Sequence, residues 1–251
     1  MSWDDFHKYY DWEFSIVCTR QRHDAVLWKK LANRFGGPIL ELGCGSGRIT
    51  IPLAEQGYEV NALDISERML FDLQEQTKHL PNIKTVQADM TDFSIDRKFN
   101  FAFIAYSSFQ LLLTLQQQKD CLKSIHKHLN EGGILAMDIA PCICEGTDIL
   151  RETHEYTAEY PVDDSTISMF TSYRIDRLNL IKHYKDRYVK IDAEGIRSEY
   201  NNKISLKECS IEYMTMLFES TGFEVLEIFG DFEGGEVSEE SYNIIYIVKK
   251  K

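Results

Sequence analysis

Three glycines at alternate positions follow a short apolar run near the start of the chain. Gly43, Gly45 and Gly47 stand in the stretch ILELGCGSGR, residues 39–48. Glycine has no Cβ atom, so it tolerates positive φ angles and lets the backbone approach a ligand closely. In an open α/β sheet, the loop after the first strand is a usual binding place for a nucleotide-like ligand. We therefore expect a ligand at this loop.

Two ligand chemistries compete for the loop. The dinucleotide fingerprint G-x-G-x-x-G would need its third glycine at position 48, where Arg48 stands. Glu41 also places a carboxylate just before the loop, where it would face an anionic pyrophosphate badly. A carboxylate suits a cationic ligand, and S-adenosylmethionine carries both an ammonium and a sulfonium group. The residues therefore favour S-adenosylmethionine over a dinucleotide.

Apolar runs separated by turn signals predict the elements that position this loop. Strands are expected at residues 38–42, 58–63, 83–88, 99–105 and 134–139. Helices are expected at residues 25–35, after Gly47, from Ser66 to about residue 79, and after a capping box at Thr114-x-x-Gln117. Alternating strands and helices predict a doubly wound, mostly parallel sheet covered on both faces, as in Rossmann-like folds.

The rhythm changes after Pro141. Residues 167–204 alternate polar and apolar side chains without a helical period, which predicts two to four antiparallel strands. Ser205-x-x-Glu208 then predicts a capping box for a helix that ends at Gly222. Two final strands, residues 223–229 and 242–248, are expected to pair antiparallel. We therefore expect one domain over residues 1–251, with residues 142–204 as a β-rich insertion.

The chain resembles, over nearly its whole length, the class I S-adenosylmethionine-dependent methyltransferases. Residues 41–47 are similar to the first motif of that family, and Asp64 is similar to its acidic residue that holds both ribose hydroxyls. QADM, residues 87–90, is similar to the motif that meets adenine. LNEGGILAMD, residues 129–138, is similar to the turn before the fifth strand, with Glu131 in place of a proline. GDFEG, residues 230–234, is similar to a stretch of bacterial small-molecule members, including relatives of amino-sugar N-methyltransferases.

The resemblance implies a seven-stranded sheet with a reversed last strand, and the small antiparallel insertion as a cover for the methyl acceptor. It also implies a cofactor site at one edge of the sheet. Its expected residues are Tyr10, Glu41, Gly43, Gly45, Gly47, Asp64, Ile65, Asp89, Met90 and Tyr106. Phe109 and Tyr173 are weaker candidates for contacts to the substrate, and no catalytic residue is assigned.

Several of these residues have an alternative interpretation that the sequence leaves open. Asp89 also fits a turn aspartate, and Tyr10 fits an anchor for the N-terminal helix. Tyr106 and Phe109 also fit plain packing after the fourth strand. Tyr173 fits the apolar face of the inserted sheet. Asp138 fits either a cleft residue or a buried, hydrogen-bonded one.

Composition limits the function further. The 251 residues carry a formal net charge of −12, which disfavours nucleic acid as a partner. No apolar stretch reaches the roughly 18 residues of a membrane span, and no signal peptide is seen at the N-terminus. Six cysteines without a CxxC pair indicate reduced thiols, hence the cytoplasm, and disfavour zinc.

The expected reaction is methyl transfer to a small molecule, with S-adenosylhomocysteine as product. Residues 105–108 carry no carboxylate after the fourth strand, so a metal is not expected. An amine acceptor needs only to be neutral, whereas a hydroxyl needs a general base or a metal, so nitrogen is slightly favoured over oxygen. The alternatives are a non-catalytic S-adenosylmethionine-binding protein and a nicotinamide-dependent oxidoreductase. The oligomeric state is not predicted.

Overall fold

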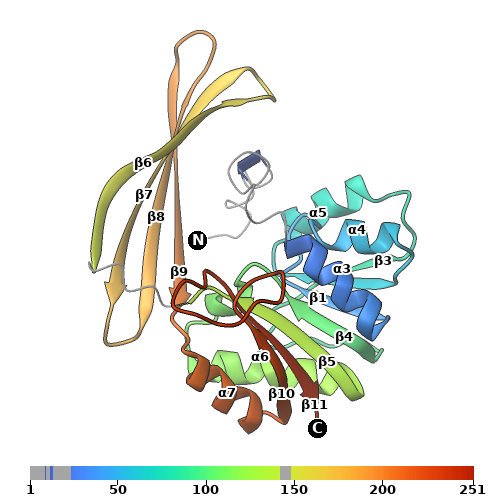
Figure 1. Cartoon of the computed structure of the whole chain (residues 1–251). Helices are drawn as coiled ribbons and strands as arrows, with labels where there is room; N and C mark the ends of the chain where they lie inside the picture. The colour runs from blue at the N-terminus through green and yellow to red at the C-terminus, as the bar shows by residue number, and fades with distance from the viewer. Residues whose placement is uncertain (1–8, 10–11, 14–23, 142–147) are drawn as a thin grey trace. The chain divides into compact units, whose positions relative to one another are not determined.

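The computed structural model describes Tyr9, Trp12 and Glu13, residues 24–141 and residues 148–251. The chain divides into two compact units. The α/β unit contains, of the described residues, 24–141 and 209–251. The β unit contains residues 148–208 together with Tyr9, Trp12 and Glu13. Each unit has its own sheet, drawn in Figure 1.

A seven-stranded sheet forms the centre of the α/β unit, in the order β10-β11-β5-β4-β1-β2-β3 (Figure 1). All its neighbouring strands are parallel except β11, which is antiparallel to both β5 and β10. The order reverses between β1 and β4, and ligands in open α/β sheets bind at such a switch point. The strands are β1 Ile39–Leu42, β2 Val60–Asp64, β3 Ile83–Gln87, β4 Phe99–Ile104, β5 Leu129–Ile139, β10 Phe223–Phe229 and β11 Ile244–Lys250.

Helices bury both faces of this sheet, because successive residues of its strands point to opposite sides. Leu40 of β1 and Ile104 of β4 belong to one apolar cluster, which includes residues of α6 and α7. Ile39 and Phe103 belong to another, in which Trp28 of α3 stacks on Phe103 at 5.1 Å between ring centroids. The helices are α3 Asp24–Phe35, α4 Thr50–Glu55, α5 Glu67–Gln76, the 3-10 turn η3 Ser108–Leu111, α6 Leu115–His128 and α7 Ile211–Ser220.

Four antiparallel strands in sequential order make up the sheet of the β unit. Tyr9 and Trp12 pack on this sheet in an apolar cluster of its own, with Ile167, Met169 and Tyr188. The predicted fold class is therefore confirmed, including the reversed last strand and the small antiparallel sheet. The strands are β6 Ile149–Tyr160, β7 Ser165–Asp176, β8 Ile181–Ile191 and β9 Arg197–Lys207.

The sequence analysis missed β6, since it placed the first antiparallel strand at about residue 167. Most side chains of β6 are exposed, and the short alternation of Tyr156, Ala158 and Tyr160 follows a polar stretch that does not share it. Strand β5 also begins at Leu129, earlier than the predicted residue 134. Pairing with neighbouring strands fixes both elements, and such pairing is a non-local interaction.

The capping box predicted at Ser205-x-x-Glu208 is wrong, whereas the one at Thr114 is confirmed. Ser205 belongs to β9, where it pairs with His183 of β8 and its hydroxyl lies 2.8 Å from the Nδ1 atom of that histidine. Helix α7 begins after Ser210, whose hydroxyl accepts a hydrogen bond from the Tyr213 N–H at 3.1 Å. The strand ladder therefore overrides a local capping signal.

None of the helices in the described part of the chain has both the length and the apolar character that crossing a bilayer requires.

The position of the α7 cap gives a stability prediction. Ser210→Ala should lower the free energy of unfolding of the α/β unit by about 1 kcal/mol, because it removes the acceptor of the Tyr213 N–H. Glu208→Gln is the control and should leave that free energy unchanged, because the cap does not use this side chain. Urea denaturation followed by circular dichroism measures both. Equal losses of stability in the two variants would mean that Glu208 takes part in the cap, as the predicted capping box requires.

Candidate active site

The glycine loop leaves β1 in a conformation that favours glycine at three positions. Gly43, Gly45 and Gly47 have φ angles of 71°, 55° and 96°. A Cβ atom on Gly43 would lie 3.2 Å from the Ser108 Cβ and Oγ atoms and 3.7 Å from the Met90 Cε atom. The loop therefore packs closely against residues that follow β3 and β4. These contacts bring three of the predicted motifs together at the carboxyl ends of the strands.

Asp64 holds the glycine loop to the end of β2. One carboxylate oxygen accepts a hydrogen bond from the Gly45 N–H at 2.8 Å, and the other accepts one from the Ser66 N–H at 2.9 Å. An ionised carboxylate has about four acceptor positions, so these two bonds leave capacity for hydroxyl donors of a ligand. Ile65 follows with 46% of its surface exposed, which offers an apolar side chain beside that carboxylate.

Glu41 lies deeper than the sequence analysis expected. Only 2% of its surface is exposed, and its carboxyl accepts a hydrogen bond from the Thr50 hydroxyl. Burial raises the pKa of Glu41 to about 8, although the positive charge of Arg48 lowers it in part. The side chain is therefore largely protonated at neutral pH and faces Thr50 rather than an open ligand surface. Its role toward a cationic ligand stays a prediction.

An ion pair that the sequence analysis missed supports the loop from the other side. The two guanidinium nitrogens of Arg48 each lie 2.6 Å from an oxygen of Asp24, the first residue of α3. Asp24 is buried, and the Trp28 Nε1–H also donates to it at 3.4 Å. The guanidinium carbon of Arg48 lies 5.9 Å from the ring centroid of Tyr106. The one sequence signal was Arg48 itself, at the position where a dinucleotide fold needs glycine.

Asp138 of β5 holds the turn after β4. Its two carboxylate oxygens accept hydrogen bonds from the Tyr106 N–H at 2.7 Å and the Ser107 N–H at 2.9 Å. Both turn residues have left-handed φ angles, 59° and 56°, which are rare for residues other than glycine. This turn keeps Tyr106 37% exposed. Of the two interpretations of Asp138, the buried and hydrogen-bonded one is therefore the one observed.

Burying the charged carboxylate of Asp138 costs free energy, and this cost raises the pKa of the group. Burial, together with the negative charge of Asp24, raises the pKa of Asp138 to about 7, and the bonds from the turn only partly offset this. A turn with unfavourable backbone angles persists where contacts with its surroundings hold it in place, as the bonds to Asp138 do here.

Asp89 is exposed and forms the turn that the sequence analysis considered. Its Oδ1 atom accepts from both the N–H and the hydroxyl of Thr91, at 2.8 and 2.7 Å. Its Oδ2 atom has no hydrogen-bond partner among the residues that the structure describes. A turn role and contact with a ligand amino group are therefore compatible. Met90 reaches the Gly43 position from the same segment.

The three remaining predicted residues are Phe109, Tyr173 and Tyr10. Phe109 is fully buried in an apolar cluster of the α/β unit, so its side chain is not exposed to an acceptor in this structure. Tyr173 belongs to the β unit, where its ring lies 5.9 Å from that of Tyr184. Tyr10 lies outside the described residues.

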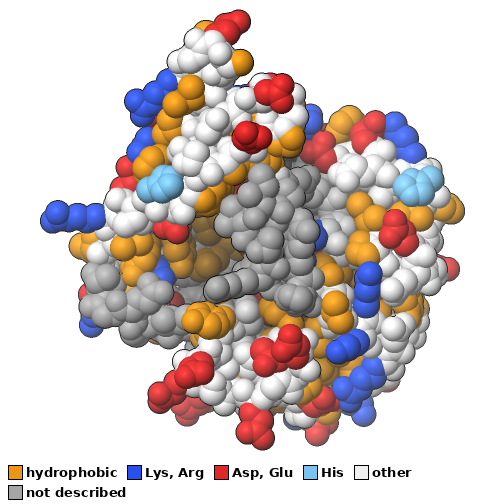
Figure 2. Space-filling model, turned by 45° about the horizontal axis from the view of Figure 1, so that its top comes forward, with side chains coloured by type: hydrophobic (Ala, Val, Ile, Leu, Met, Phe, Trp, Pro, Cys, Tyr) orange, Lys and Arg blue, Asp and Glu red, His pale blue; other side chains and the backbone are white. Residues whose placement is uncertain are grey.

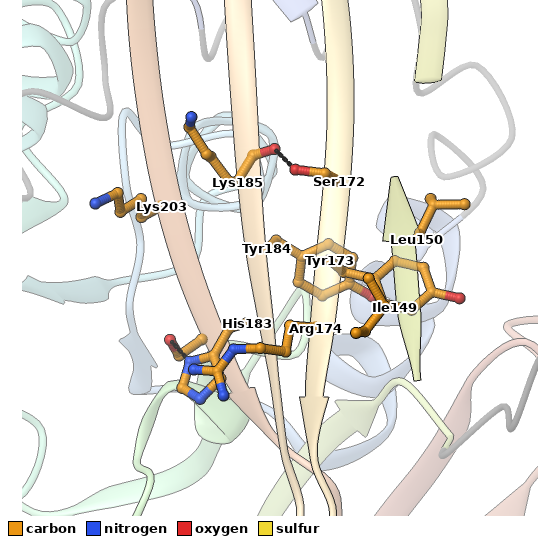
Figure 3. A pocket seen from close by; sticks show the side chains of 10 residues that line it. Ile149, Leu150, Ser172, Tyr173, Arg174, His183, Tyr184, Lys185 and Lys203 are labelled. Carbon is orange, nitrogen blue, oxygen red and sulfur yellow. Dashed lines mark hydrogen bonds between the residues drawn. The ribbon is translucent and has the colours of Figure 1, made fainter. Parts of the chain in front are cut away.

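A depression of about 440 Å³ is found within the β unit (Figure 3). It is distinct from the strand ends just described, because all of its lining residues belong to β6, β7, β8 and β9. Its lysine and arginine residues are Arg174, Lys185 and Lys203, no acidic residue of the described ranges lines it, and Tyr173 is the one predicted residue in it.

The strand-end group fits a nucleoside ligand that carries a positive charge. The glycine loop is a cradle that a Cβ atom at Gly43 would fill, and Asp64 presents a carboxylate suited to paired hydroxyl groups. Ile65 and Tyr106 add exposed apolar surface, and Asp89 adds an acceptor for an amino group.

Comparison with known proteins agrees with this fit. Residues 39–133 match the family model described as a methyltransferase domain. A putative methyltransferase of Geobacillus sp. (strain WCH70) is 27% identical over 219 residues, which cover 84% of each chain. In several other curated relatives the match is shorter and covers 41–42% of their length.

Solved structures extend the likeness to nearly the whole chain. An S-adenosylmethionine-dependent methyltransferase of Clostridium acetobutylicum ATCC 824 superposes with a TM-score of 0.84 at 15% identity, over 98% of both chains. The sugar N-methyltransferase of Streptoalloteichus sp. ATCC 53650 gives a TM-score of 0.75 at 18% identity, over 96% of this chain and 93% of its own. At such identities these two likenesses concern the fold.

The position of Asp64 gives a binding prediction. Asp64→Ala should weaken S-adenosylmethionine binding by at least about tenfold, because charge-assisted hydrogen bonds contribute roughly 1.5–3 kcal/mol each and ~1.4 kcal/mol is a factor of ten. Asp64→Asn keeps one acceptor oxygen and should fall between Ala and wild type. Asp96→Ala, at an exposed position, is the control for titration calorimetry. If the folded Asp64→Ala protein bound S-adenosylmethionine with wild-type affinity, Asp64 would not belong to the cofactor site.

The pKa of Asp138 gives a prediction of pH dependence. The unfolded chain releases this proton near pH 4, whereas the folded protein holds it up to about pH 7. The stability that wild type has in excess of Asp138→Asn should therefore shrink as the pH rises from about 4 to about 7. Urea denaturation of both proteins across this range measures the difference, and Asp96→Asn is the control. A constant difference would contradict the raised pKa.

Proposed function

The chain belongs to the class I S-adenosylmethionine-dependent methyltransferases, and from this premise we propose that it methylates the nitrogen of an amine on a small molecule. The strand-end group supports the cofactor part of the proposal. The turn after β4 supports the acceptor part, because the carboxylate that holds it, Asp138, is buried and bonded to two backbone N–H groups.

The residues proposed to hold S-adenosylmethionine come from four strand ends. The backbone of Gly43, Gly45 and Gly47 would face the amino-acid part, and Asp64 would accept from the ribose hydroxyls. Ile65 and Met90 would flank the adenine, with the free Oδ2 atom of Asp89 at its amino group. The bound cofactor supplies a methyl group already activated by its sulfonium. The protein then mainly has to orient the methyl acceptor and exclude water.

The bonding of Asp138 in the turn after β4 favours nitrogen over oxygen as the atom that accepts the methyl group. A neutral amine already has a lone pair for in-line attack, whereas a hydroxyl acceptor needs a base to remove its proton. Asp138 cannot move toward an acceptor without releasing the Tyr106 and Ser107 N–H groups. One structural relative is a sugar N-methyltransferase, and this supports the same preference. We propose that no metal takes part.

We further propose that the β unit serves the acceptor and not the cofactor. The described residues assigned to the cofactor all lie in the α/β unit. The β unit has a separate apolar cluster and its own polar groups, so it can be built around a different ligand. The prediction of an inserted acceptor cover at residues 142–204 stays a proposal in this form, with strands that run on to Lys207.

Nucleic acid remains an unfavoured partner in this proposal. Acidic and basic side chains are mixed on the face of the molecule drawn in Figure 2, in keeping with the net charge of −12. Cys44, Cys121 and Cys209 are buried and form no disulfide within the described part of the chain, and we propose a cytoplasmic location.

The proposal predicts which of two matched acceptors is methylated. Incubation with S-adenosylmethionine and D-glucosamine should yield S-adenosylhomocysteine and an N-methyl product, detected by mass spectrometry, whereas D-glucose should yield neither. A wider set of paired amines and alcohols extends the test to other scaffolds. Methylation of the alcohols alone would contradict the choice of nitrogen. Tight cofactor binding without turnover on any acceptor would instead favour a non-catalytic binding protein.

A further inference from the structure

One face of the sheet in the β unit carries a polar row between two aromatic rows. Thr171, Asp186 and Asn202 are direct partners across β7, β8 and β9, so their side chains share a face. The next row on one side is Tyr173, Tyr184 and Ile204; the two tyrosines are labelled in Figure 3. The next row on the other side is Met169, Tyr188 and Tyr200.

Hydrogen-bond acceptors outnumber donors along the polar row. The Glu13 carboxylate accepts from the Tyr156 hydroxyl at 3.0 Å and from the Tyr188 hydroxyl at 2.6 Å. Asp186 accepts from the Thr171 hydroxyl at 2.7 Å. Asn202 is 2% exposed, and its buried Oδ1 atom has no partner in the described part of the chain. A buried acceptor without a donor is costly, and each hydroxyl of the row is already engaged.

The row is also negatively charged without a counter-ion. Burial, together with the charges of Glu13 and Glu155, raises the pKa of Asp186 to about 6, although the bond from Thr171 lowers it in part. Among the described residues, no lysine or arginine forms an ion pair with Glu13 or Asp186. Arg187 pairs with Glu152 and Glu199, and its register places it on the opposite face. A cation with several N–H donors would satisfy both the charge and the orphan oxygen.

The surroundings favour an organic ammonium over a metal ion. The ring centroids of Tyr9 and Tyr188 lie 5.3 Å apart, and those of Tyr188 and Tyr200 lie 6.0 Å apart. Aromatic faces attract organic cations, whereas Ca²⁺ and Mg²⁺ need six or more oxygen ligands. Asp186 is only partly buried, so its carboxylate can be reached from solvent, whereas Asn202 lies deeper in the row.

We propose that Asp186, Glu13 and Asn202 bind the ammonium group of a small-molecule ligand on this face of the β unit. The Asn202 Oδ1 atom and the Asp186 carboxylate accept its N–H groups, and the tyrosines of the neighbouring rows enclose its carbon atoms. That the ligand is the methyl acceptor rests on the proposed function, in which the bound ammonium first releases a proton to water, because only the neutral amine carries the lone pair that attacks the methyl group. The binding itself makes and breaks no covalent bond.

The test uses the full-length protein with two amines and their neutral counterparts. NMR titration should detect D-glucosamine and ethanolamine, and should detect D-glucose and ethylene glycol at least about tenfold more weakly, because they lack the charge-assisted bonds. Asp186→Asn and Asn202→Ala should each weaken amine binding by a similar factor. Glu159→Gln, at an exposed position of the same sheet, is the matched control and should bind the amines like wild type.

A second readout separates binding from a purely structural role. Asp186→Asn removes a charge next to Glu13, so without ligand it should raise the melting temperature while it weakens amine binding. Equal binding of amines and neutral analogues, or unchanged amine binding by Asp186→Asn, would overturn the proposal, as would wild type that binds neither amine.

The site and the methyl-transfer activity can fail separately. S-adenosylmethionine affinity, measured in the same variants, should stay at the wild-type value. Amine binding without turnover would refute the proposed function and leave the site in place. Turnover of amines that is insensitive to Asp186→Asn would refute the site and leave the function in place.

Discussion

Backbone N–H groups bonded to two aspartates hold the loops on which the candidate site depends. Asp64 accepts from Gly45 and fixes the glycine loop to β2, and Asp138 accepts from Tyr106 and Ser107 and fixes the turn after β4. Both loops adopt left-handed backbone angles, which relax readily without an anchor. The two aspartates come from strands on either side of the switch point between β1 and β4, so the sheet itself sets the distance between the loops. The rigid sheet thus fixes the positions of these two irregular loops.

The same arrangement concentrates acidic groups in the interior of the α/β unit. Asp24, Glu41 and Asp138 are all buried, and Arg48 is the cation that pairs with one of them. Burial without enough counter-charge raises the pKa values of Glu41 and Asp138, so part of this charge is neutralised by protons. An interior of this kind disfavours a pyrophosphate and is compatible with a cationic ligand. The proposal of a cationic ligand therefore rests on the site as a whole, because Glu41 itself bonds to Thr50.

The sequence was sufficient for those features that local pattern determines. Alternate glycines, apolar strands and the Thr114 capping box predicted the α/β sheet and the position of the glycine loop. The non-local pairs could not be predicted: Asp24 and Arg48 lie far apart along the chain, and Asp138 fitted two roles until its partners across β4 were known. Strand β6 was missed because its exposed polar residues gain their structure from pairing with β7. Ser205 failed as a helix cap for the same reason, since its ladder with His183 competes with the cap.

The two units use similar polar side chains in different ways. In the α/β unit, each carboxylate that shapes a loop is bonded to backbone N–H groups, so part of its acceptor capacity is used within the protein. In the β unit, the polar row of Asp186 and Asn202 is left with unmet acceptors between aromatic side chains. A folded protein tolerates such unmet acceptors at a cost in stability, and that cost is lowest when a ligand supplies the donors. The unpartnered oxygen of Asn202 on β9, next to the Asp186 carboxylate on β8, therefore indicates that this face of the sheet binds a ligand.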